Sequence, residues 1–236
     1  MKSFKILLAA SVLALSASTA FAGDYGYGAG YGTWDNSSSS QASGSNILNN
    51  QVNLQTNWSN LMGVVDTVGG DVVAQGAAAG NMVDVTTMND TRVLNNQYVG
   101  SQATIGSNIS MDANNVWGSV GVQNQVLCNG ASVSTDPILT AVTSNQECHS
   151  KDPYSGVSAL VTNVGGNAVF QGSAIGNTFE ADSNAPNFPV ISRQLNNSAV
   201  ISNMGVSAFN VGGTVGMSSS AIGNTSQIIH YNTNGH

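Results

Sequence analysis

Cysteine is the residue type with the most specific chemistry in this 236-residue sequence. Cys128 and Cys148 are the only two cysteines, and they flank a stretch that contains Pro137. In an oxidising compartment an even pair of cysteines usually forms a disulfide. No CxxC and no His-rich pattern near them favours a redox or metal-binding thiol pair instead. The sequence therefore predicts a disulfide between Cys128 and Cys148.

Residues suited to catalysis are sparse. The sequence contains no HExxH, GxSxG, GxGxxG or phosphate-binding glycine loop. The histidines are His149, His230 and His236, and none has a partner at metal-binding helical spacing. A glycosidase would need a fold that assembles two of the carboxylates of Asp66, Asp71, Asp84 and Asp112. We therefore expect no enzyme, no metal and no cofactor, and rank a solenoid polysaccharide-degrading enzyme below the other function classes.

The first 22 residues have the layout of a secretory signal peptide. Lys2 and Lys5 precede an apolar run over residues 6–15, and Ala20-Phe21-Ala22 has the small-x-small pattern of a cleavage site. The apolar run is too short to span a bilayer, and no later stretch is apolar enough to do so as a helix. We predict cleavage after Ala22, no transmembrane helix, and a secreted or cell-surface protein.

The composition after Ala22 excludes several partners. Only three basic residues remain against twelve acidic ones, a net charge of −9. Nucleic acid binding needs clustered Lys and Arg, and so does binding to anionic lipid. Polarity comes from uncharged side chains, above all from 29 asparagines. Such a composition is typical of a prion-like disordered chain or of stacked β-structure with amide ladders, and periodicity distinguishes the two.

The sequence contains four segments with regular spacing, which must position the cysteines and the amide side chains. They start at Val68, Val116, Val164 and Val211, which are 48, 48 and 47 residues apart. They align without a gap, and the first and third share nine of fourteen residues. We predict four repeats of about 48 residues, with repeat cores at residues 61–85, 109–133, 157–181 and 204–228.

Apolar residues alternate with polar ones in every repeat, which is typical of half-buried strands. The apolar columns after each starting Val are Val72, Val120, Ala168 and Val215; Ala74, Val122, Phe170 and Met217; and Ala78, Val126, Ala174 and Ala221. A strand of opposite phase precedes each starting Val, and another follows each Gly-Asn pair. Leu-Asn-Asn recurs at residues 48–50, 94–96 and 195–197, which suggests a fourth short strand in each repeat.

Glycine and asparagine are expected to make the turns between these strands, because glycine permits positive φ. At the first turn of each repeat the predicted residues are Gly69, Gly70, Gly118, Gly165, Gly166, Gly212 and Gly213. At the second they are Gly80, Asn81, Asn129, Gly176, Asn177, Gly223 and Asn224, with Cys128 in place of one glycine. A disulfide from Cys128 would therefore staple a turn.

These patterns predict an all-β protein that is a β-solenoid, because one repeat alone could not bury its apolar face. A β-sandwich of similar strand count is the alternative, although it does not require identical columns. The repeat domain is expected to cover residues 47–236. Residues 23–46 are rich in Gly, Tyr and Ser with almost no aliphatic side chains, and are expected to form a flexible tether.

The Gln-Gly-x-x-x-Gly-Asn stretches at residues 75–81 and 171–177 resemble the repeats of curlin-type bacterial fibre subunits. The repeat here is about twice as long as in curlin, and the Tyr/Gly-rich start is more similar to the holdfast-attachment proteins of stalked bacteria. This resemblance implies display at the outer membrane surface, self-association, and anchoring of an adhesive polysaccharide. We expect a structural or adhesive protein whose partners are copies of itself, other surface proteins or polysaccharide. A monomeric glycan-binding solenoid is the alternative.

Overall fold

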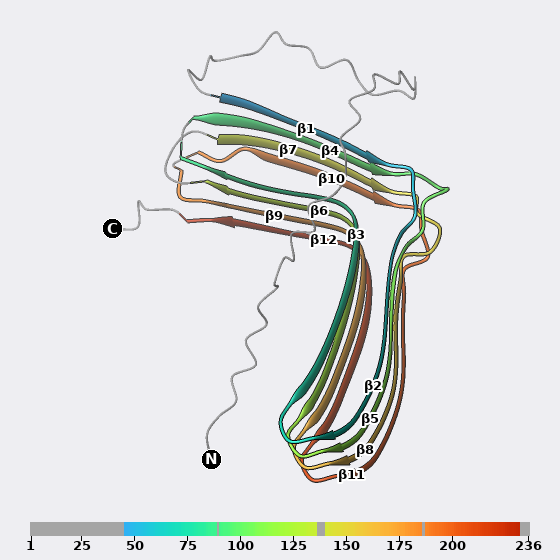
Figure 1. The fold of residues 1–236 in the computed structure, drawn as a ribbon. Helices are drawn as coiled ribbons and strands as arrows, with labels where there is room; N and C mark the ends of the chain where they lie inside the picture. Colours follow the sequence, from blue (N-terminus) through green and yellow to red (C-terminus); the bar gives the residue numbers. More distant parts are fainter. Residues whose placement is uncertain (1–44, 89, 136–139, 186, 232–236) are drawn as a thin grey trace. The chain divides into compact units, whose positions relative to one another are not determined.

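Each of the four repeats contributes three strands, and equivalent strands stack in parallel to form three four-stranded sheets (Figure 1). The structure, a computed structural model, describes residues 45–88, 90–135, 140–185 and 187–231. No helix occurs in these ranges. The prediction of a β-solenoid is confirmed, and we call its four layers rungs 1 to 4, in chain order.

The three sheets differ in strand length. The short sheet consists of β1 (Ser45–Asn53), β4 (Thr91–Val99), β7 (Thr140–Cys148) and β10 (Val190–Asn196). The middle sheet consists of β2 (Asn57–Val68), β5 (Ile105–Val116), β8 (Tyr154–Val164) and β11 (Ile201–Val211). The long sheet consists of β3 (Val72–Thr87), β6 (Val120–Thr135), β9 (Ala168–Ser183) and β12 (Val215–His230). The short sheet contains the predicted fourth strand of the repeat.

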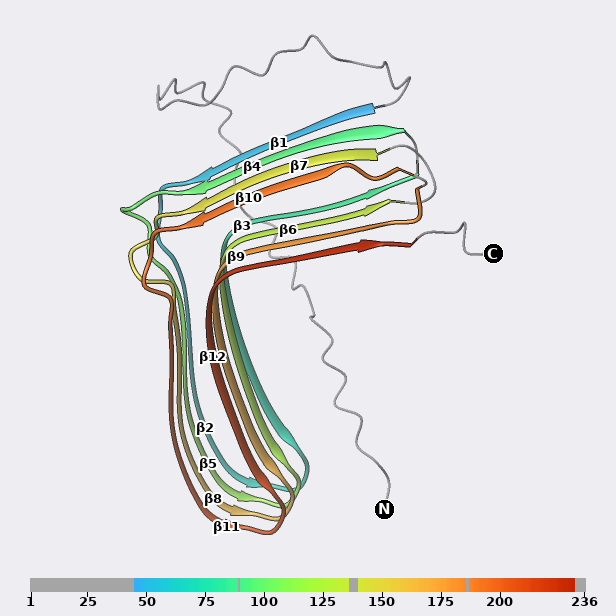
Figure 2. The same cartoon turned by 180° about the vertical axis from the view of Figure 1, so that it is seen from behind.

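Each long strand bends and serves two cores (Figures 1 and 2). Its first half faces the middle sheet, and its second half faces the short sheet. The prediction that Gly80-Asn81 and its equivalents are turns between two strands is wrong, because β3 continues through both residues. The parallel pairing skips Gly80, and the alternation of buried residues shifts there by one position. In a sequence such a shift resembles a turn, but it is an irregularity of one continuous strand.

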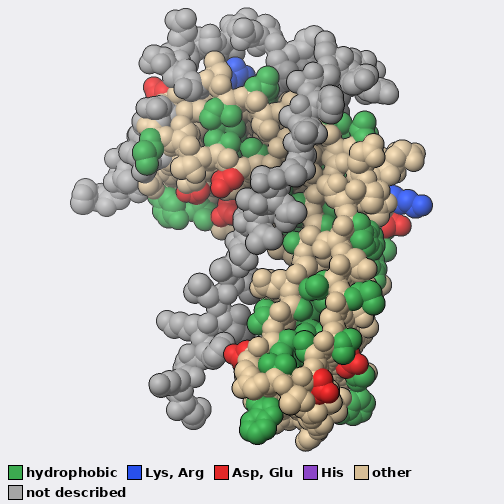
Figure 3. Space-filling view, in the orientation of Figure 1, with side chains coloured by type: hydrophobic (Ala, Val, Ile, Leu, Met, Phe, Trp, Pro, Cys, Tyr) green, Lys and Arg blue, Asp and Glu red, His purple; other side chains and the backbone are tan. Residues whose placement is uncertain are grey.

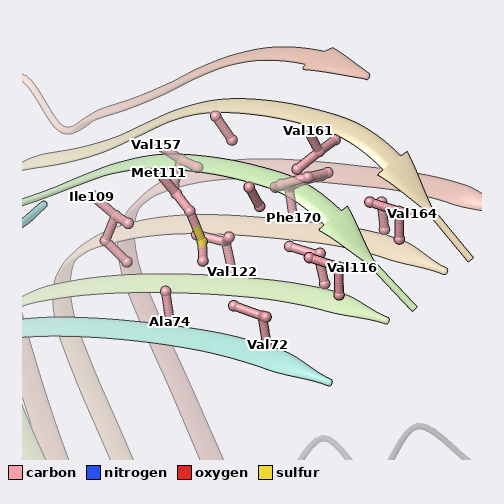
Figure 4. Packing of buried hydrophobic residues seen from close by; sticks show 14 residues of the cluster. Val72, Ala74, Ile109, Met111, Val116, Val122, Val157, Val161, Val164 and Phe170 are labelled. Atoms are coloured by element: carbon pink, nitrogen blue, oxygen red, sulfur yellow. The ribbon is translucent and has the colours of Figure 1, made fainter. Parts of the chain in front are cut away.

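Three apolar cores hold the sheets together. The largest lies between the middle sheet and the first half of the long sheet, where Ile109, Met111, Val122 and Phe170 interdigitate (Figure 4). A second lies between the short sheet and the second half of the long sheet, around Val133 and Phe179. The third fills the corner where all three sheets meet. Its members are Val99, Ala103, Ile105, Val126, Cys128, Cys148 and Ala174.

The turns between the middle and long sheets obtain their positive φ from a residue other than glycine. The residue just before each starting Val has a φ of 53° to 57°; these residues are Thr67, Asn115, Asn163 and Asn210. The glycines that follow have no positive φ in this range, so the predicted reason for them is wrong. Glycine is needed because stacked turns approach closely: a Cβ on Gly165 would lie 2.5 Å from the carbonyl oxygen of Trp117.

The ends of the described chain define what the fold includes. Strand β1 begins at Ser45, two residues before the predicted start of the repeat domain. The predicted signal peptide, its cleavage site at Ala22, and most of the predicted tether lie outside the described residues. Within residues 45–231, apart from the gaps given above, no helix is long and apolar enough to cross a membrane.

Candidate assembly surface

An asparagine ladder runs through all four rungs at the bends of the long strands. Asn81 Nδ2 donates to Asn129 Oδ1 at 2.9 Å, and Asn129 Nδ2 donates to Asn177 Oδ1 at 2.8 Å. Asn177 Nδ2 donates in turn to Asn224 Oδ1 at 2.8 Å. Each bond therefore points from a rung to the next one along the chain. The sequence marked these four residues as turn formers, whereas they bind one another across the stack.

A glutamine ladder runs through the short sheet in the opposite direction. Gln97 Nε2 donates to Gln51 Oε1 at 3.0 Å, and Gln146 Nε2 donates to Gln97 Oε1 at 2.8 Å. Gln194 Nε2 completes the ladder with a bond to Gln146 Oε1 at 2.9 Å. Here each bond points from a rung to the preceding one. Sequence reasoning missed this ladder, although Gln51 and Gln97 directly follow a Leu-Asn-Asn motif and Gln194 directly precedes one.

Backbone contacts fix the orientation of these amides. The nitrogens of Asn81, Asn129 and Asn177 also donate to carbonyl oxygens of the short sheet, at 2.9 Å in each case. The four glutamine nitrogens donate to carbonyl oxygens of the long strands, those of Met82, Gly130, Thr178 and Thr225. A flipped amide would place its oxygen against a carbonyl oxygen. The direction of each ladder is therefore determined by the fold.

The two ends of the stack are open in the described residues. We call the end formed by β10, β11 and β12 the C-terminal face, and the end formed by β1, β2 and β3 the N-terminal face. On the C-terminal face, core-column residues of β12 lie exposed: Met217 has 62% and Ile228 51% of its surface accessible. Their partners in β9, Phe170 and Ala181, are fully buried.

The N-terminal face contains an apolar hollow of about 400 Å³ between β2 and β3. Leu61, Val65, Val72 and Ala74 line it in rung 1, together with Ile109 of rung 2. A further layer that stacked on rung 1 in the register of the other rungs would cover this hollow. Both faces thus combine unpaired strand edges with uncovered apolar side chains, which is the arrangement that templates addition of another chain.

A separate hollow lies at the turns. Trp117 occupies the position that glycine has in the other three turns, and 77% of its surface is exposed. It borders a hollow of about 390 Å³ together with the asparagines of the turn column, Asn115, Asn163 and Asn210. These asparagines form their own ladder, since Asn163 Nδ2 donates to Asn115 Oδ1 and Asn210 Nδ2 to Asn163 Oδ1. An exposed indole beside amides is suited to stacking and hydrogen bonding with a sugar.

The predicted disulfide is present, with an Sγ–Sγ distance of 2.09 Å between Cys128 and Cys148. It does not staple a turn, because Cys128 lies inside β6 and Cys148 is the last residue of β7. The bond joins the long strand of rung 2 to the short strand of rung 3 in the corner core. It therefore links the two interior rungs covalently.

The residues considered for catalysis lie apart from the cores. Asp66 accepts hydrogen bonds from Asn115 and Asn114, and Asp71 accepts one from the backbone of Ser119. Asp84 and Asp112 are exposed on the outer faces of their strands. His149 contacts Glu147 at 3.3 Å, and His230 contacts the carbonyl oxygen of Ala185. His236 lies outside the described residues, and within the described ranges no three His, Cys, Asp or Glu side chains gather to hold a metal.

The described part of the chain has few charged side chains on its surface, as Figure 3 shows for one face of the molecule. Comparison with protein-family models, curated proteins and solved structures gives no match for this chain.

Proposed function

We propose that this chain is a secreted or cell-surface structural protein that acts by assembly. Copies stack end to end through the two open faces, and the resulting polymer forms a curli-like fibre or anchors other surface material. The observation that carries this proposal is the exposure of core-column side chains, above all Met217, on the C-terminal face. A solenoid that works as a monomer normally covers its terminal layers with polar or helical caps.

The chemistry of the chain favours assembly in two further ways. Its low charge would oppose docking only weakly, because 7% of its residues are charged. The amide ladders also belong to the kind of structure in which identical side chains stack along a fibre axis. The resemblance of the Gln-Gly-x-x-x-Gly-Asn stretches to curlin repeats supports the same function.

Electron microscopy and gel filtration of the purified mature chain, residues 23–236, test this proposal. We expect fibres or ladders of oligomers whose size increases with concentration. Truncation after Asn224 removes the last six residues of β12 and should leave a folded chain with altered association. A truncated chain with unchanged oligomer size and unchanged surface attachment would contradict assembly through the C-terminal edge.

A second candidate function is glycan binding by a single copy, and the hollow at Trp117 favours it. A neutral polysaccharide would stack on the indole and bond to the asparagine column. Isothermal titration with surface polysaccharide compares the wild type with Trp117→Gly, which restores the residue of the other three turns. Binding by a stable monomer that Trp117→Gly abolishes would favour this function over assembly. Catalysis remains the third class, and we propose that the protein is not an enzyme.

A further inference from the structure

We infer that the partner of each open face is the opposite face of a second copy of this chain, and that the two amide ladders impose this polarity. The inference rests on the proposed function, because it requires that copies associate. It adds which face meets which, and through which atoms.

The C-terminal face presents one donor and one acceptor from the ladders. Asn224 Oδ1 already accepts from Asn177, whereas no described residue accepts from Asn224 Nδ2. Gln194 Nε2 already donates to Gln146 and to the carbonyl oxygen of Thr225. No described residue donates to Gln194 Oε1. The face therefore offers an N–H group at the bend of the long strand and an oxygen on the short strand.

The N-terminal face presents the complementary pair. Both N–H groups of Asn81 are used, on Asn129 and on the carbonyl oxygen of Tyr98, and no described residue donates to Asn81 Oδ1. Gln51 Nε2 donates to the carbonyl oxygen of Met82, which leaves its second N–H group without a described acceptor. This face therefore offers an oxygen at the bend and an N–H group on the short strand.

Stacking rung 4 of one copy on rung 1 of the next joins these atoms pairwise. Asn224 Nδ2 then donates to Asn81 Oδ1 of the second copy, and Gln51 Nε2 of the second copy donates to Gln194 Oε1. Both bonds repeat the direction of the ladder that they extend. In the same register Met217 stands over Ala74, at the apolar hollow between β2 and β3, so that a large side chain meets a small one.

Contacts between like faces lack this match. A two-fold axis that joins two C-terminal faces runs the facing strands antiparallel, so the columns no longer superimpose. The ladder atoms of both copies then lose their partners, and a buried amide without a partner is costly. Head-to-tail contacts are heterologous and do not close, and they produce filaments.

Two substitutions test the polarity, because each removes the outward donor of one face and keeps the hydrogen bond to the neighbouring rung of the same copy. Asn224→Asp keeps the oxygen that accepts from Asn177 and replaces the outward donor with a carboxylate oxygen. Gln51→Glu keeps the oxygen that accepts from Gln97 and replaces the outward donor of the N-terminal face, although it also gives up the bond to Met82. The matched controls are Asn203→Asp in rung 4 and Gln55→Glu in rung 1, which are exposed residues outside the ladders with the same change of charge.

Sedimentation of mature wild type, variants and controls measures the association, with circular dichroism as a check that each variant folds. We expect each ladder variant alone to need a concentration at least about tenfold higher for polymerisation than the wild type, and the controls to assemble normally. Mixed one to one, the two ladder variants should form dimers and no longer polymers, because only one pair of intact faces remains.

Each other result overturns the inference in a recognisable way. If either ladder variant alone forms a stable dimer, like faces associate, and the polarity is wrong while assembly stands. If both variants polymerise as the wild type does, or if the mixture remains monomeric, the ladders do not join the copies. If the wild type remains monomeric, the two faces do not associate, and the proposed function fails as well.

Discussion

Rungs 3 and 4 place equivalent residues at the same positions of the stack. The core-column residues of β9 are buried in rung 3, and their partners in β12 of rung 4 are exposed. Phe170 of rung 3 is completely buried, whereas Met217, its partner in rung 4, is mostly exposed. Ala174 and Ala221 differ in the same way. Among the described residues, rung 3 has a layer on both sides and rung 4 has one on a single side. In a solenoid the burial of a core residue therefore depends as much on the neighbouring layer as on its own sequence.

The largest expected effect on stability comes from placing one charge at the same column of each rung. Ala174→Asp places a carboxylate in the corner core, where an unpaired buried charge costs about 3–5 kcal/mol. That is much of the stability of a typical domain, so we expect the array to unfold. Ala221→Asp, at the same column of rung 4, should leave the free energy of unfolding nearly unchanged.

Urea denaturation followed by circular dichroism measures both variants under conditions in which the protein is monomeric. Equal destabilisation by the two substitutions would mean that rung 4 is covered in solution, and the comparison between the rungs would fail.

The disulfide sharpens the comparison because it joins two interior rungs and leaves both end rungs free. A bond that closes a loop of 20 residues should stabilise the fold by about 3 kcal/mol through the entropy of the unfolded chain. We expect the double variant Cys128→Ala and Cys148→Ala to lose about this amount in urea denaturation.

Titration of the unreduced, denatured wild type with a thiol reagent provides the control. The expected uptake is zero, and two equivalents per chain would rule out the bond. A double variant as stable as the wild type would show that the corner core holds the interior rungs without the covalent link.

A smaller effect is expected at the turns, where glycines of different rungs differ in their surroundings. A Cβ on Gly165 would meet the carbonyl oxygen of Trp117, whereas a Cβ on Gly69 of rung 1 has no atom within 4 Å. Gly165→Ala should therefore destabilise the protein by about 1–3 kcal/mol through overpacking, and Gly69→Ala by less than about 0.5 kcal/mol.

Thermal unfolding of both variants tests this pair of glycines. If Gly69→Ala were the more harmful substitution, backbone conformation would determine the need for glycine at these turns. Close stacking of the turns would then be the wrong explanation.

The sequence was sufficient to predict the solenoid because stacking imposes a constant period and a constant alternation. The residues between Val68, Val116, Val164 and Val211 correspond to one layer of the stack each. The apolar residues at every second position after these valines correspond to the buried face of the long strand. The disulfide was predictable for a different reason, since only one pair of cysteines exists in the chain.

The amide ladders and the bend in the long strand could not be predicted in the same way. A Gly-Asn pair at a phase shift is also typical of a turn, and local chemistry does not distinguish a turn from a shift of the alternation within a continuous strand. The bond between Asn81 and Asn129 joins residues 48 positions apart and exists only because the stacking register superimposes them. The recurrence of Asn at one alignment column was the available signal.

The opposite directions of the two ladders also have an electrical consequence. Side-chain amides that donate toward one end of a stack align their dipoles, and a single ladder would add to its field with every layer. Here the asparagine and glutamine ladders have three bonds each and point in opposite directions. The asparagines of the turn column donate toward the preceding rung, as the glutamines do. In a polymer the asparagine ladder at the bends would therefore offset part of the field that the other two ladders build up with every layer.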